Sequence, residues 1–340
     1  MNEMIRQNVP LAPYTTFHIG GEAANFAEAS TEEEVRSVCR FAKENGLPLT
    51  VLGGGSNVLV GEQGLPGLVL HIALKGITHE ATADGAVLFA KAGETFDDVV
   101  AYAVAHDLWG LENLSHIPGT VGATPVQNVG AYGVEIQDLC SAVRVYDTQT
   151  DAFIALPASA CAFSYRDSIF KKPEGKRYVI TEVVFTLRRE PRPQIAYRDL
   201  AAYFSGSPTP TLAEIREAVG VIRSRKFPDW NTVGTAGSFF KNPIISPDAA
   251  QKLREKFPEL PIFETAEGMM KISLGYILDK VLGLRGYREG NVRLYEEQAL
   301  VLVAERGASA EEIKTFAQKI SEKVFTATGI VIEFEVNILS

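Results

Sequence analysis

The chain has 340 residues, of which 46% are apolar and 22% charged, a balance typical of globular proteins. Its formal charge of 33 − 42 = −9 argues against non-specific binding to nucleic acid or to an anionic membrane surface. The sequence has neither the apolar stretch of a signal peptide nor a run approaching the roughly 18 apolar residues of a membrane span, so we expect a cytoplasmic protein.

Predicted helices and strands are interspersed through the first half of the chain. A helix is predicted from Ser30 to Gly46, because Ser30 can cap it, Glu33 stands at the capping-box position and apolar residues recur on one face. A short buried strand at 49–52 precedes a glycine-rich loop. Further elements follow in this order: strands at 67–72 and 86–91, a helix from Thr95, and strands at 142–147 and 178–187.

The second half begins with a proline-rich surface excursion at 189–211. Helices are then predicted to start at three capping signals: Thr211 with Glu214, running to about Lys226; Ser246 with Pro247; and Ser309 with Glu312. The segment from Ile330 to Ile338 alternates as a strand, with Glu333 and Glu335 on the face opposite the apolar residues. A domain boundary is expected near residues 226–232 and a weaker one near residue 75.

Glycines cluster in two places, with six from Gly53 to Gly67 and four from Gly119 to Gly133. The first cluster directly follows a strand, so its backbone N–H groups can form an anion site for a pyrophosphate. It is neither a Rossmann fingerprint, which would need glycine at Val58, nor a P-loop. Taken singly, one cluster can be a tight turn and the other, at 117–133, a packed Ω-loop; together they favour a dinucleotide ligand.

Three further segments can carry chemistry, each with a structural alternative. Arg166, between hydroxyl and carboxylate residues, suits a carboxylate or a developing oxyanion, or else forms a surface ion pair. Ser238 follows a glycine that can present its hydroxyl, or else starts a capped strand. Glu333 and Glu335 can perturb each other's pKa, as acid–base sites require, or else lie on a solvated sheet face.

The remaining reactive residue types point to no site. The five histidines have no metal-ligand spacing, so we expect no metal, and His18 is expected to be structural rather than a flavin attachment point. The three cysteines, Cys39, Cys140 and Cys161, lie far apart in the sequence, which indicates reduced structural thiols rather than a zinc site or disulfides.

The order of seven motifs is more specific than any one of them. They are Thr15-Thr16-Phe17-His18-Ile19-Gly20-Gly21, Leu52-Gly53-Gly54-Gly55-Ser56-Asn57, Gly110-Leu111-Glu112-Asn113-Leu114, Ile117-Pro118-Gly119-Thr120-Val121-Gly122, Gln127-Asn128-Val129-Gly130-Ala131-Tyr132-Gly133, Tyr165-Arg166-Asp167-Ser168 and Gly237-Ser238-Phe239-Phe240-Lys241-Asn242-Pro243. In this order, from about residue 14 to residue 336, the chain closely resembles the UDP-N-acetylenolpyruvoylglucosamine reductases, also called UDP-N-acetylmuramate dehydrogenases.

The resemblance implies an α+β (mixed α/β) fold. A vanillyl-alcohol-oxidase-type FAD-binding domain would form two subdomains, residues 1–75 and 76–226. A C-terminal α+β substrate-binding domain, residues 227–340, would return its last strand to the active site. The resemblance also implies non-covalent FAD, NADPH as co-substrate and a role in peptidoglycan precursor synthesis. NADPH and UDP-N-acetylglucosamine enolpyruvate would alternate at one site of a monomer.

By position, the resemblance assigns a site to this chain. Arg166, Ser238 and Glu335 fall on the family's catalytic residues: Arg166 and Glu335 would stabilise the charge of an enolate, and Ser238 would protonate it. Tyr197 resembles the substrate-covering tyrosine of the loop-containing subtype, and Lys226, Asn242 and Gln298 resemble contacts to the UDP-sugar. The predicted FAD contacts are Gly53, Gly54, Gly55, Ser56, Asn57, Gly119, Gly122, Ala123, Thr124 and Asn128.

One departure concerns the C-terminal segment, where Asn337 stands at a position that is usually arginine in this family. The alternatives are another FAD oxidase of the same domain type, acting on a sugar or a lactone, and a non-catalytic UDP-sugar-binding protein. If the chain is a reductase of this family, its ligands FAD, NADPH and the UDP-sugar are all anionic, although the chain itself is acidic. We therefore expect a cleft whose local potential opposes the net charge, lined by backbone N–H groups, Arg166 and Lys226.

Overall fold

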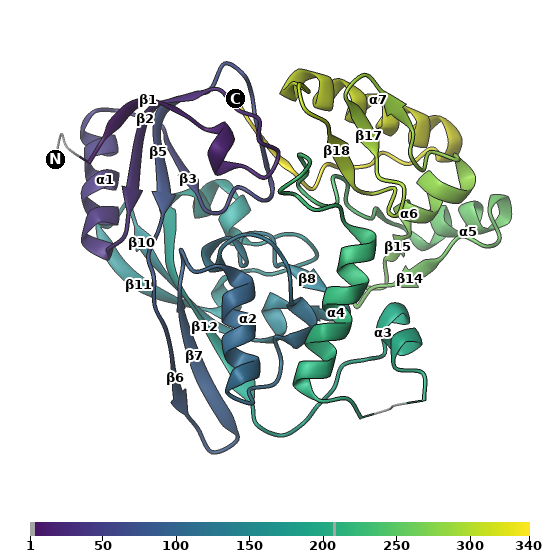
Figure 1. Ribbon diagram of the computed structural model, residues 1–340, viewed down its shortest axis with the longest axis horizontal. Helices are drawn as coiled ribbons and strands as arrows, with labels where there is room; N and C mark the ends of the chain where they lie inside the picture. Colours follow the sequence, from purple (N-terminus) through teal and green to yellow (C-terminus); the bar gives the residue numbers. More distant parts are fainter. Residues whose placement is uncertain (1–3, 207–208) are drawn as a thin grey trace. The chain divides into compact units, whose positions relative to one another are not determined.

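The computed structural model describes residues 4–206 and 209–340, so residues 207 and 208 of the predicted surface excursion lie outside the described residues. The chain forms two compact units, both of mixed α and β structure, as predicted (Figure 1). Unit 1 holds the residues up to Val9, Ala23–Gly55 and Leu65–Arg223; unit 2 holds Pro10–Glu22, Ser56–Gly64 and Ser224–Ser340. Within the described part, no helix is both long and apolar enough to span a bilayer.

Among the described residues of unit 1, two larger sheets lie on either side of residue 75 in the sequence, and β8 and β9 form a small two-stranded sheet. The first has the order β1-β2-β5-β3, with β5 parallel to both neighbours. The second has the order β11-β10-β12-β7-β6 and is antiparallel throughout. The strands of unit 1 are β1 (Arg6–Pro10), β2 (Glu22–Ala29), β3 (Leu49–Leu52), β5 (Leu65–Ile72), β6 (Ile77–Ala81), β7 (Gly85–Lys91), β8 (Gly130–Ala131), β9 (Val134–Glu135), β10 (Cys140–Asp147), β11 (Ala152–Pro157) and β12 (Tyr178–Arg188).

In the described part of the chain, α-helices accompany these sheets, and the loops contain short 3₁₀ turns. The α-helices are α1 (Glu32–Glu44), α2 (Phe96–Ala105), α3 (Arg198–Tyr203) and α4 (Leu212–Lys226), whose last residues belong to unit 2. The 3₁₀ turns of both units are η1 (Ala12–Tyr14), η2 (Glu112–Leu114), η3 (Val121–Ala123), η4 (Ile136–Asp138), η5 (Ala158–Ala160), η6 (Ile169–Lys171) and η7 (Pro173–Arg177).

The predicted first helix is present, but its cap is shifted by one residue. Thr31, not Ser30, is the N-cap, and Glu34 rather than Glu33 completes the capping box. The sequence Ser30-Thr31 is followed by three glutamates, so the capping-box spacing is satisfied whether Ser30 or Thr31 is the N-cap. Ser30 assists the cap, because its hydroxyl also donates to the Glu34 carboxylate at 2.8 Å.

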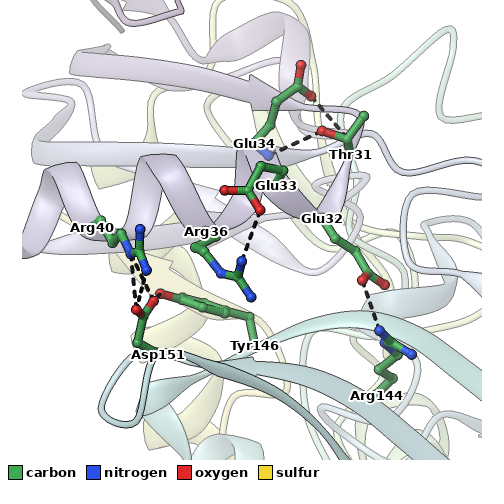
Figure 2. A network of polar contacts seen from close by, with 9 residues as sticks. All are labelled: Thr31, Glu32, Glu33, Glu34, Arg36, Arg40, Arg144, Tyr146 and Asp151. Carbon is green, nitrogen blue, oxygen red and sulfur yellow. Dashed lines mark hydrogen bonds and ion pairs between the residues drawn. The ribbon is translucent and has the colours of Figure 1, made fainter.

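Charged side chains tie α1 to the second sheet of unit 1 (Figure 2). Arg40 on the helix holds the carboxylate of Asp151, which also accepts a 2.6 Å bond from the Tyr146 hydroxyl. Nearer the start of the helix, the Arg144 guanidinium donates to Glu32 at 3.0 Å. Apolar residues from α1, α2, β5, β7, β10 and β12 form one core, so the two sheets share a hydrophobic interior.

A part-buried ion pair joins α2 to α4, which run side by side (Figure 1). Arg216 on α4 donates two bonds, of 2.7 and 2.8 Å, to the carboxylate of Asp97 on α2, which also accepts from the His116 N–H at 2.5 Å. Burial favours a higher pKa for Asp97, but the hydrogen bonds from Arg216 and His116 outweigh it and hold the pKa below its usual value. The start of the second glycine-rich segment is thereby attached to both helices.

We expect Arg216→Met to lower the free energy of unfolding by about 1–3 kcal/mol near pH 7, between the values typical of exposed and buried pairs. Because the folded-state pKa of Asp97 lies below the unfolded value, the pair stabilises the fold above about pH 4, and this contribution is lost as the pH falls through the folded-state pKa. Urea unfolding at a series of pH values measures both effects.

The matched control is Arg225→Met, since Arg225 is an exposed arginine on the same helix. This control should change the unfolding free energy by less than about 0.5 kcal/mol. A deficit in Arg216→Met that is the same at pH 7 and at pH 3 would show that the lost stability comes from packing rather than from the ion pair.

Unit 2 consists of small sheets around the long helix α7. Its sheets are β13-β15-β14 and β16-β17-β18, and β19 pairs in parallel with β4. The strands are β4 (Val58–Val60), β13 (Ile244–Ile245), β14 (Ile262–Glu264), β15 (Met270–Ile272), β16 (Arg288–Glu289), β17 (Val292–Leu294), β18 (Leu302–Ala304) and β19 (Asn337–Leu339). The helices are α5 (Pro247–Lys256), α6 (Leu274–Tyr276), the π-turn η8 (Ile277–Val281) and α7 (Ala310–Thr328).

The predicted continuous strand from Ile330 to Ile338 is wrong, because only 337–339 form a regular strand. The alternation still reports burial: Ile332 and Val336 are buried, while Val331 is 76% exposed. The segment is extended and pairs with residues 239–241 through isolated contacts such as the bridge of Phe240 with Phe334. An alternating pattern therefore predicted the buried face correctly but not a ladder of hydrogen bonds.

The other predicted elements are present within one or two residues of their expected ends, including the three helices that begin after Thr211, Ser246 and Ser309. The predicted domain boundaries at residues 75 and 226 stay predictions. Two segments from the N-terminal part of the chain belong to unit 2. The local composition of these segments does not predict this assignment.

Candidate functional site

The two glycine-rich loops meet in unit 1, where their backbones approach closely. A Cβ atom on Gly53 would lie 2.4 Å from Thr120 Oγ1, and one on Gly54 would lie 3.0 Å from the Cα of Gly119. Both distances are shorter than ordinary contacts with a side chain. The Thr120 side chain therefore disfavours a larger residue at Gly53, and the Gly119 backbone disfavours one at Gly54, so the end of β3 lies against the loop before η3.

Thr120 supplies the observation that tests whether a cofactor fits between these loops. Its hydroxyl oxygen is buried and has no hydrogen-bond partner among the described residues. Buried polar groups are nearly always paired, so an unpaired hydroxyl beside Gly53 and Gly54 suits an oxygen of a bound pyrophosphate. The sequence prediction did not include Thr120 among the cofactor contacts, although its position between two loop glycines was a usable signal.

Several other predicted FAD contacts have their side chains engaged within the protein. The Thr124 hydroxyl donates to the Val121 carbonyl at 2.8 Å. The Asn128 amide donates to Glu135 and to the Ser164 carbonyl and accepts from the Gln137 N–H. Both residues shape the loop, so a contact of Asn128 with FAD through its amide donors would need these bonds to open.

The rest of the predicted FAD set is placed by packing and by backbone shape. Gly122 packs against β7, since a Cβ there would lie 2.7 Å from that of Ala92, whereas Ala123 is exposed. Gly55 adopts a positive φ of 60° and ends the unit 1 part of the loop, while Ser56 and Asn57 belong to unit 2. Among the ten predicted contacts, the structure brings Gly54 directly against Gly119, and it places Gly53 against the neighbouring Thr120.

Arg166 lies at the tip of a tight hairpin in unit 1. Ser164 and Asp167 exchange two backbone hydrogen bonds, of 3.1 and 3.2 Å, and Arg166 takes the left-handed conformation with φ of 55°. Its Nη2 donates to the Gly130 carbonyl at 2.9 Å, and its guanidinium lies over the ring of Tyr165. The hairpin and the second glycine-rich loop therefore hold Arg166 together. The neighbouring Asp167 forms an ion pair with Lys172.

Ser238 and Glu335 come together in unit 2. The N–H of Glu335 donates to the Phe239 carbonyl at 2.8 Å, and Ser238 forms a bridge with Val301. Phe239 and Phe240 are fully buried, so the backbone that carries Ser238 is anchored in the core. The backbones that carry the two predicted catalytic residues of this unit are thus held by main-chain contacts.

Two threonines and a glycine form the turn before Ser238. The Thr16 hydroxyl donates to the Thr235 carbonyl at 2.6 Å, and the Thr235 hydroxyl accepts from the Gly237 N–H at 3.2 Å. Gly237 has a φ of 72°, a conformation that favours glycine. The first motif of the sequence therefore contributes to presenting Ser238, a role that its residues did not indicate on their own.

Asn57 links the first glycine-rich loop to the C-terminal segment. Its amide donates to the Glu335 carbonyl at 3.2 Å, and its own carbonyl accepts from the Asn337 N–H at 3.0 Å. The backbone of Asn337 is thus used in pairing, while its side chain is exposed.

The predicted substrate residues occupy different parts of the two units. In unit 2, Asn242 Oδ1 accepts from the Leu274 N–H at 3.0 Å, Gln298 lies beside Gly275, and Lys226 is half-buried at the end of α4. In unit 1, Tyr197 is 47% exposed. Its ring packs edge-on against that of Tyr132 at 5.4 Å.

The paired-carboxylate hypothesis for Glu333 and Glu335 is not supported. Glu333 is exposed, and its carboxylate pairs with Lys241 at 2.8 Å, whereas Glu335 is half-buried.

The ring of His18 forms a hydrogen bond with the Trp230 carbonyl at 2.8 Å. The three cysteines are free and buried, and burial raises the pKa of each thiol. Across residues 4–206 and 209–340, no group of three or more potential side-chain ligands could hold a metal ion.

Comparison with known proteins adds independent information. A family model described as an FAD binding domain matches residues 23–152, and one described as the UDP-N-acetylenolpyruvoylglucosamine reductase C-terminal domain matches residues 229–339. Reductases of that name from Neisseria meningitidis serogroup A and Pseudomonas aeruginosa PAO1 are 41% and 39% identical to this chain. The alignments cover 98% and 99% of this chain, and 97% and 100% of the relatives.

A solved structure has the same fold. The UDP-N-acetylenolpyruvylglucosamine reductase from Thermus caldophilus superposes with a TM-score of 0.70 and 24% identity, covering 99% of this chain and all of that one. The folds and the matched domains define an FAD-dependent oxidoreductase with a distinct C-terminal domain. More specifically, the chain belongs to the UDP-N-acetylenolpyruvoylglucosamine reductase family of peptidoglycan precursor synthesis, which confirms the resemblance found in the sequence.

We expect Thr120→Val to weaken FAD binding by roughly tenfold, because valine keeps the shape of threonine but removes the hydroxyl that faces the glycine loop. A lost hydrogen bond to a charged group costs about 1.5–3 kcal/mol, and 1.4 kcal/mol is a factor of ten in affinity. Titration of the apoprotein with FAD measures the change. Thr120→Ser, which keeps the hydroxyl, is the matched control. Equal affinities of the Val and Ser variants would remove Thr120 from the cofactor site.

Proposed function

We propose that this chain reduces the enolpyruvyl ether of UDP-N-acetylglucosamine to UDP-N-acetylmuramate, with non-covalently bound FAD and with NADPH as the reductant. The observation that carries the proposal is the main-chain bond from the Glu335 N–H to the Phe239 carbonyl, 2.8 Å long. It pairs the backbone of Glu335 with that of Phe239, the residue after Ser238, a potential proton donor, in a chain of this family. Relatives named for the same substrate cover the whole length of the chain.

The reaction needs charge stabilisation and one well-placed proton. FAD, when bound and reduced, supplies a hydride from N5 to the terminal carbon, C3, of the vinyl ether. Negative charge then builds at C2 and spreads into the substrate carboxylate as an enolate. The protein must stabilise that charge and deliver a proton to C2.

Each predicted catalytic residue has one role in this scheme. Arg166 pairs with the substrate carboxylate, since a guanidinium can bind it through two hydrogen bonds. Glu335, in its protonated form, donates a hydrogen bond to the enolate. Ser238 delivers the proton to C2; because a hydroxyl is a weak acid, this step depends on a basic acceptor and on positioning. Arg166 lies in unit 1 and the other two in unit 2, so their meeting at one substrate is part of the proposal.

Substrate and NADPH alternate at one site in this proposal, which predicts ping-pong kinetics. Tyr197 covers the substrate, as in the loop-containing subtype, and Lys226, Asn242 and Gln298 contact the UDP-sugar, with Lys226 serving the phosphates of both ligands. The FAD contacts are those predicted from the sequence, with Thr120 added. We place the reaction in the cytoplasm and expect a monomer, divided at residues 75 and 226 into two FAD subdomains and a substrate domain.

We expect Ser238→Ala to leave reduction of the flavin by NADPH nearly unchanged and to slow reoxidation by the enolpyruvyl substrate by orders of magnitude. The substitution removes the proton donor for C2 but no group needed for hydride transfer from NADPH. Anaerobic stopped-flow absorbance at about 450 nm follows both half-reactions. The first half-reaction is the internal control, since a misfolded variant would lose it too. An equal effect on both half-reactions, or no effect on either, would contradict the assignment of Ser238.

A simpler experiment tests the function itself. Purified wild-type protein should be yellow, bleach on addition of NADPH without oxygen, and regain its colour only when the enolpyruvyl sugar nucleotide is added. Acid precipitation should release the flavin into the supernatant. Flavin retained in the pellet, or reoxidation by oxygen but not by the sugar nucleotide, would instead indicate an oxidase of the same domain type.

A further inference from the structure

The motif Gly110-Leu111-Glu112-Asn113-Leu114 has no role in the reaction described so far, yet it contains a completely buried amide. Asn113 has 0% of its surface exposed and lies in the 3₁₀ turn η2. Glu112 is buried too, but its carboxylate accepts from the Gly110 N–H at 2.6 Å and so closes the turn itself. Asn113, in contrast, reaches two distant segments of unit 1.

Both N–H donors of the Asn113 amide are used, each on a backbone carbonyl. One bond runs to the Tyr132 carbonyl at 2.8 Å and the other to the Gln194 carbonyl at 2.7 Å. Only an amide nitrogen in this position satisfies both carbonyls, because a flipped amide would set its oxygen against two other oxygens. The side chain therefore fastens the proline-rich loop to the second glycine-rich loop.

Both of these carbonyls belong to backbone that fixes Tyr197. Tyr132 adopts a φ of 49°, and its buried ring forms the edge-on contact with the Tyr197 ring. Gln194 lies three residues before Tyr197 on the same loop. Asn113 thus holds the ring's packing partner and the chain that leads to the ring.

The loop is anchored differently on the other side of Tyr197. Leu200, in α3, is fully buried in a small apolar cluster with Trp109 and Leu212. Tyr197 itself and its neighbours Ala196 and Arg198 are exposed. The segment that carries Tyr197 therefore lies between Leu200 on one side and, on the other, Ile195, which packs against the same apolar cluster, and Gln194, whose carbonyl is bound by the Asn113 amide.

We propose that Asn113 is a positioning residue for Tyr197, and that it sets the affinity for the UDP-sugar substrate without touching it. This inference rests on the proposed function only in taking Tyr197 as a substrate contact. The position of Tyr197 before substrate binds is a property of unit 1 alone. It can therefore be tested with or without turnover.

The main experiment is a double-mutant cycle of Asn113→Asp and Tyr197→Ala in the FAD-bound enzyme. Aspartate matches asparagine in shape but turns both donors into acceptors that face carbonyls, so KM for the enolpyruvyl substrate should rise on the order of tenfold. Flavin content and the rate of flavin reduction at saturating NADPH should stay within about twofold. In the Tyr197→Ala background, Asn113→Asp should raise KM no further.

A second variant avoids disturbing a buried position. Two glycines inserted after Ile195 keep the Asn113 bonds and leave Ile195 on its side of the insertion, but they lengthen the exposed link through Ala196 to Tyr197. They should raise KM as Asn113→Asp does, so the proposal remains testable if Asn113→Asp does not fold. Additive effects in the cycle, or an unchanged KM in the insertion variant, would overturn the proposal.

Hydrogen exchange without substrate separates this proposal from the proposed function. Backbone amides of residues 195–199 should exchange faster in Asn113→Asp than in wild type, while those of β10 and β12 should not change. Unaltered exchange at 195–199 would overturn the positioning role even in an active enzyme. Faster exchange in a protein that fails to turn over the enolpyruvyl sugar would support the positioning role while the proposed reaction fails.

Discussion

The contact between two backbones at Gly53–Gly54 and Gly119–Thr120 is the constraint on which the rest of unit 1 depends. One backbone leaves the parallel sheet at the end of β3, and the other is packed against β7 through Gly122. A larger residue at Gly53 or Gly54 would push the two loops apart. The residues that each loop contributes to a binding site would then be separated. The second loop also positions two other side chains. Its Gly130 carbonyl accepts a hydrogen bond from the Arg166 guanidinium, and its Tyr132 carbonyl accepts one from the Asn113 amide.

In unit 2, main-chain contacts hold the backbone on either side of the two proposed catalytic residues. The positions of Ser238 and Glu335 are set by main-chain bonds and by the buried rings of Phe239 and Phe240. Thr16 and Asn57, which come from N-terminal segments, complete the support through the Thr235 and Glu335 carbonyls. Such support places a hydroxyl and a carboxyl group on a rigid framework, as preorganised catalysis requires.

Sequence reasoning succeeded where the signal is local. Capping residues predicted the starts of α4, α5 and α7, and the glycine clusters predicted a close approach of backbones. It failed where the decisive partner is distant. Asn57 and Asn128 are placed by carbonyls at Glu335 and Ser164, and no periodicity or spacing near either asparagine encodes those partners. The last segment shows the same limit, since alternation reports which face is buried but not whether a neighbouring strand is there to pair with it.

The composition of unit 2 has a consequence for the order in which the chain can fold during synthesis. Unit 1 has all its residues once Arg223 has been made, whereas unit 2 needs Pro10–Glu22 and Ser56–Gly64 from the beginning of the chain and β19 from its end. Because β4 pairs in parallel with β19, it must wait unpaired through the translation of nearly everything that follows. Closing so long a loop is entropically costly and slow. The strand that follows Glu335 is therefore among the last parts of the molecule to assemble, and a chain interrupted late in synthesis has a complete unit 1 but an incomplete unit 2.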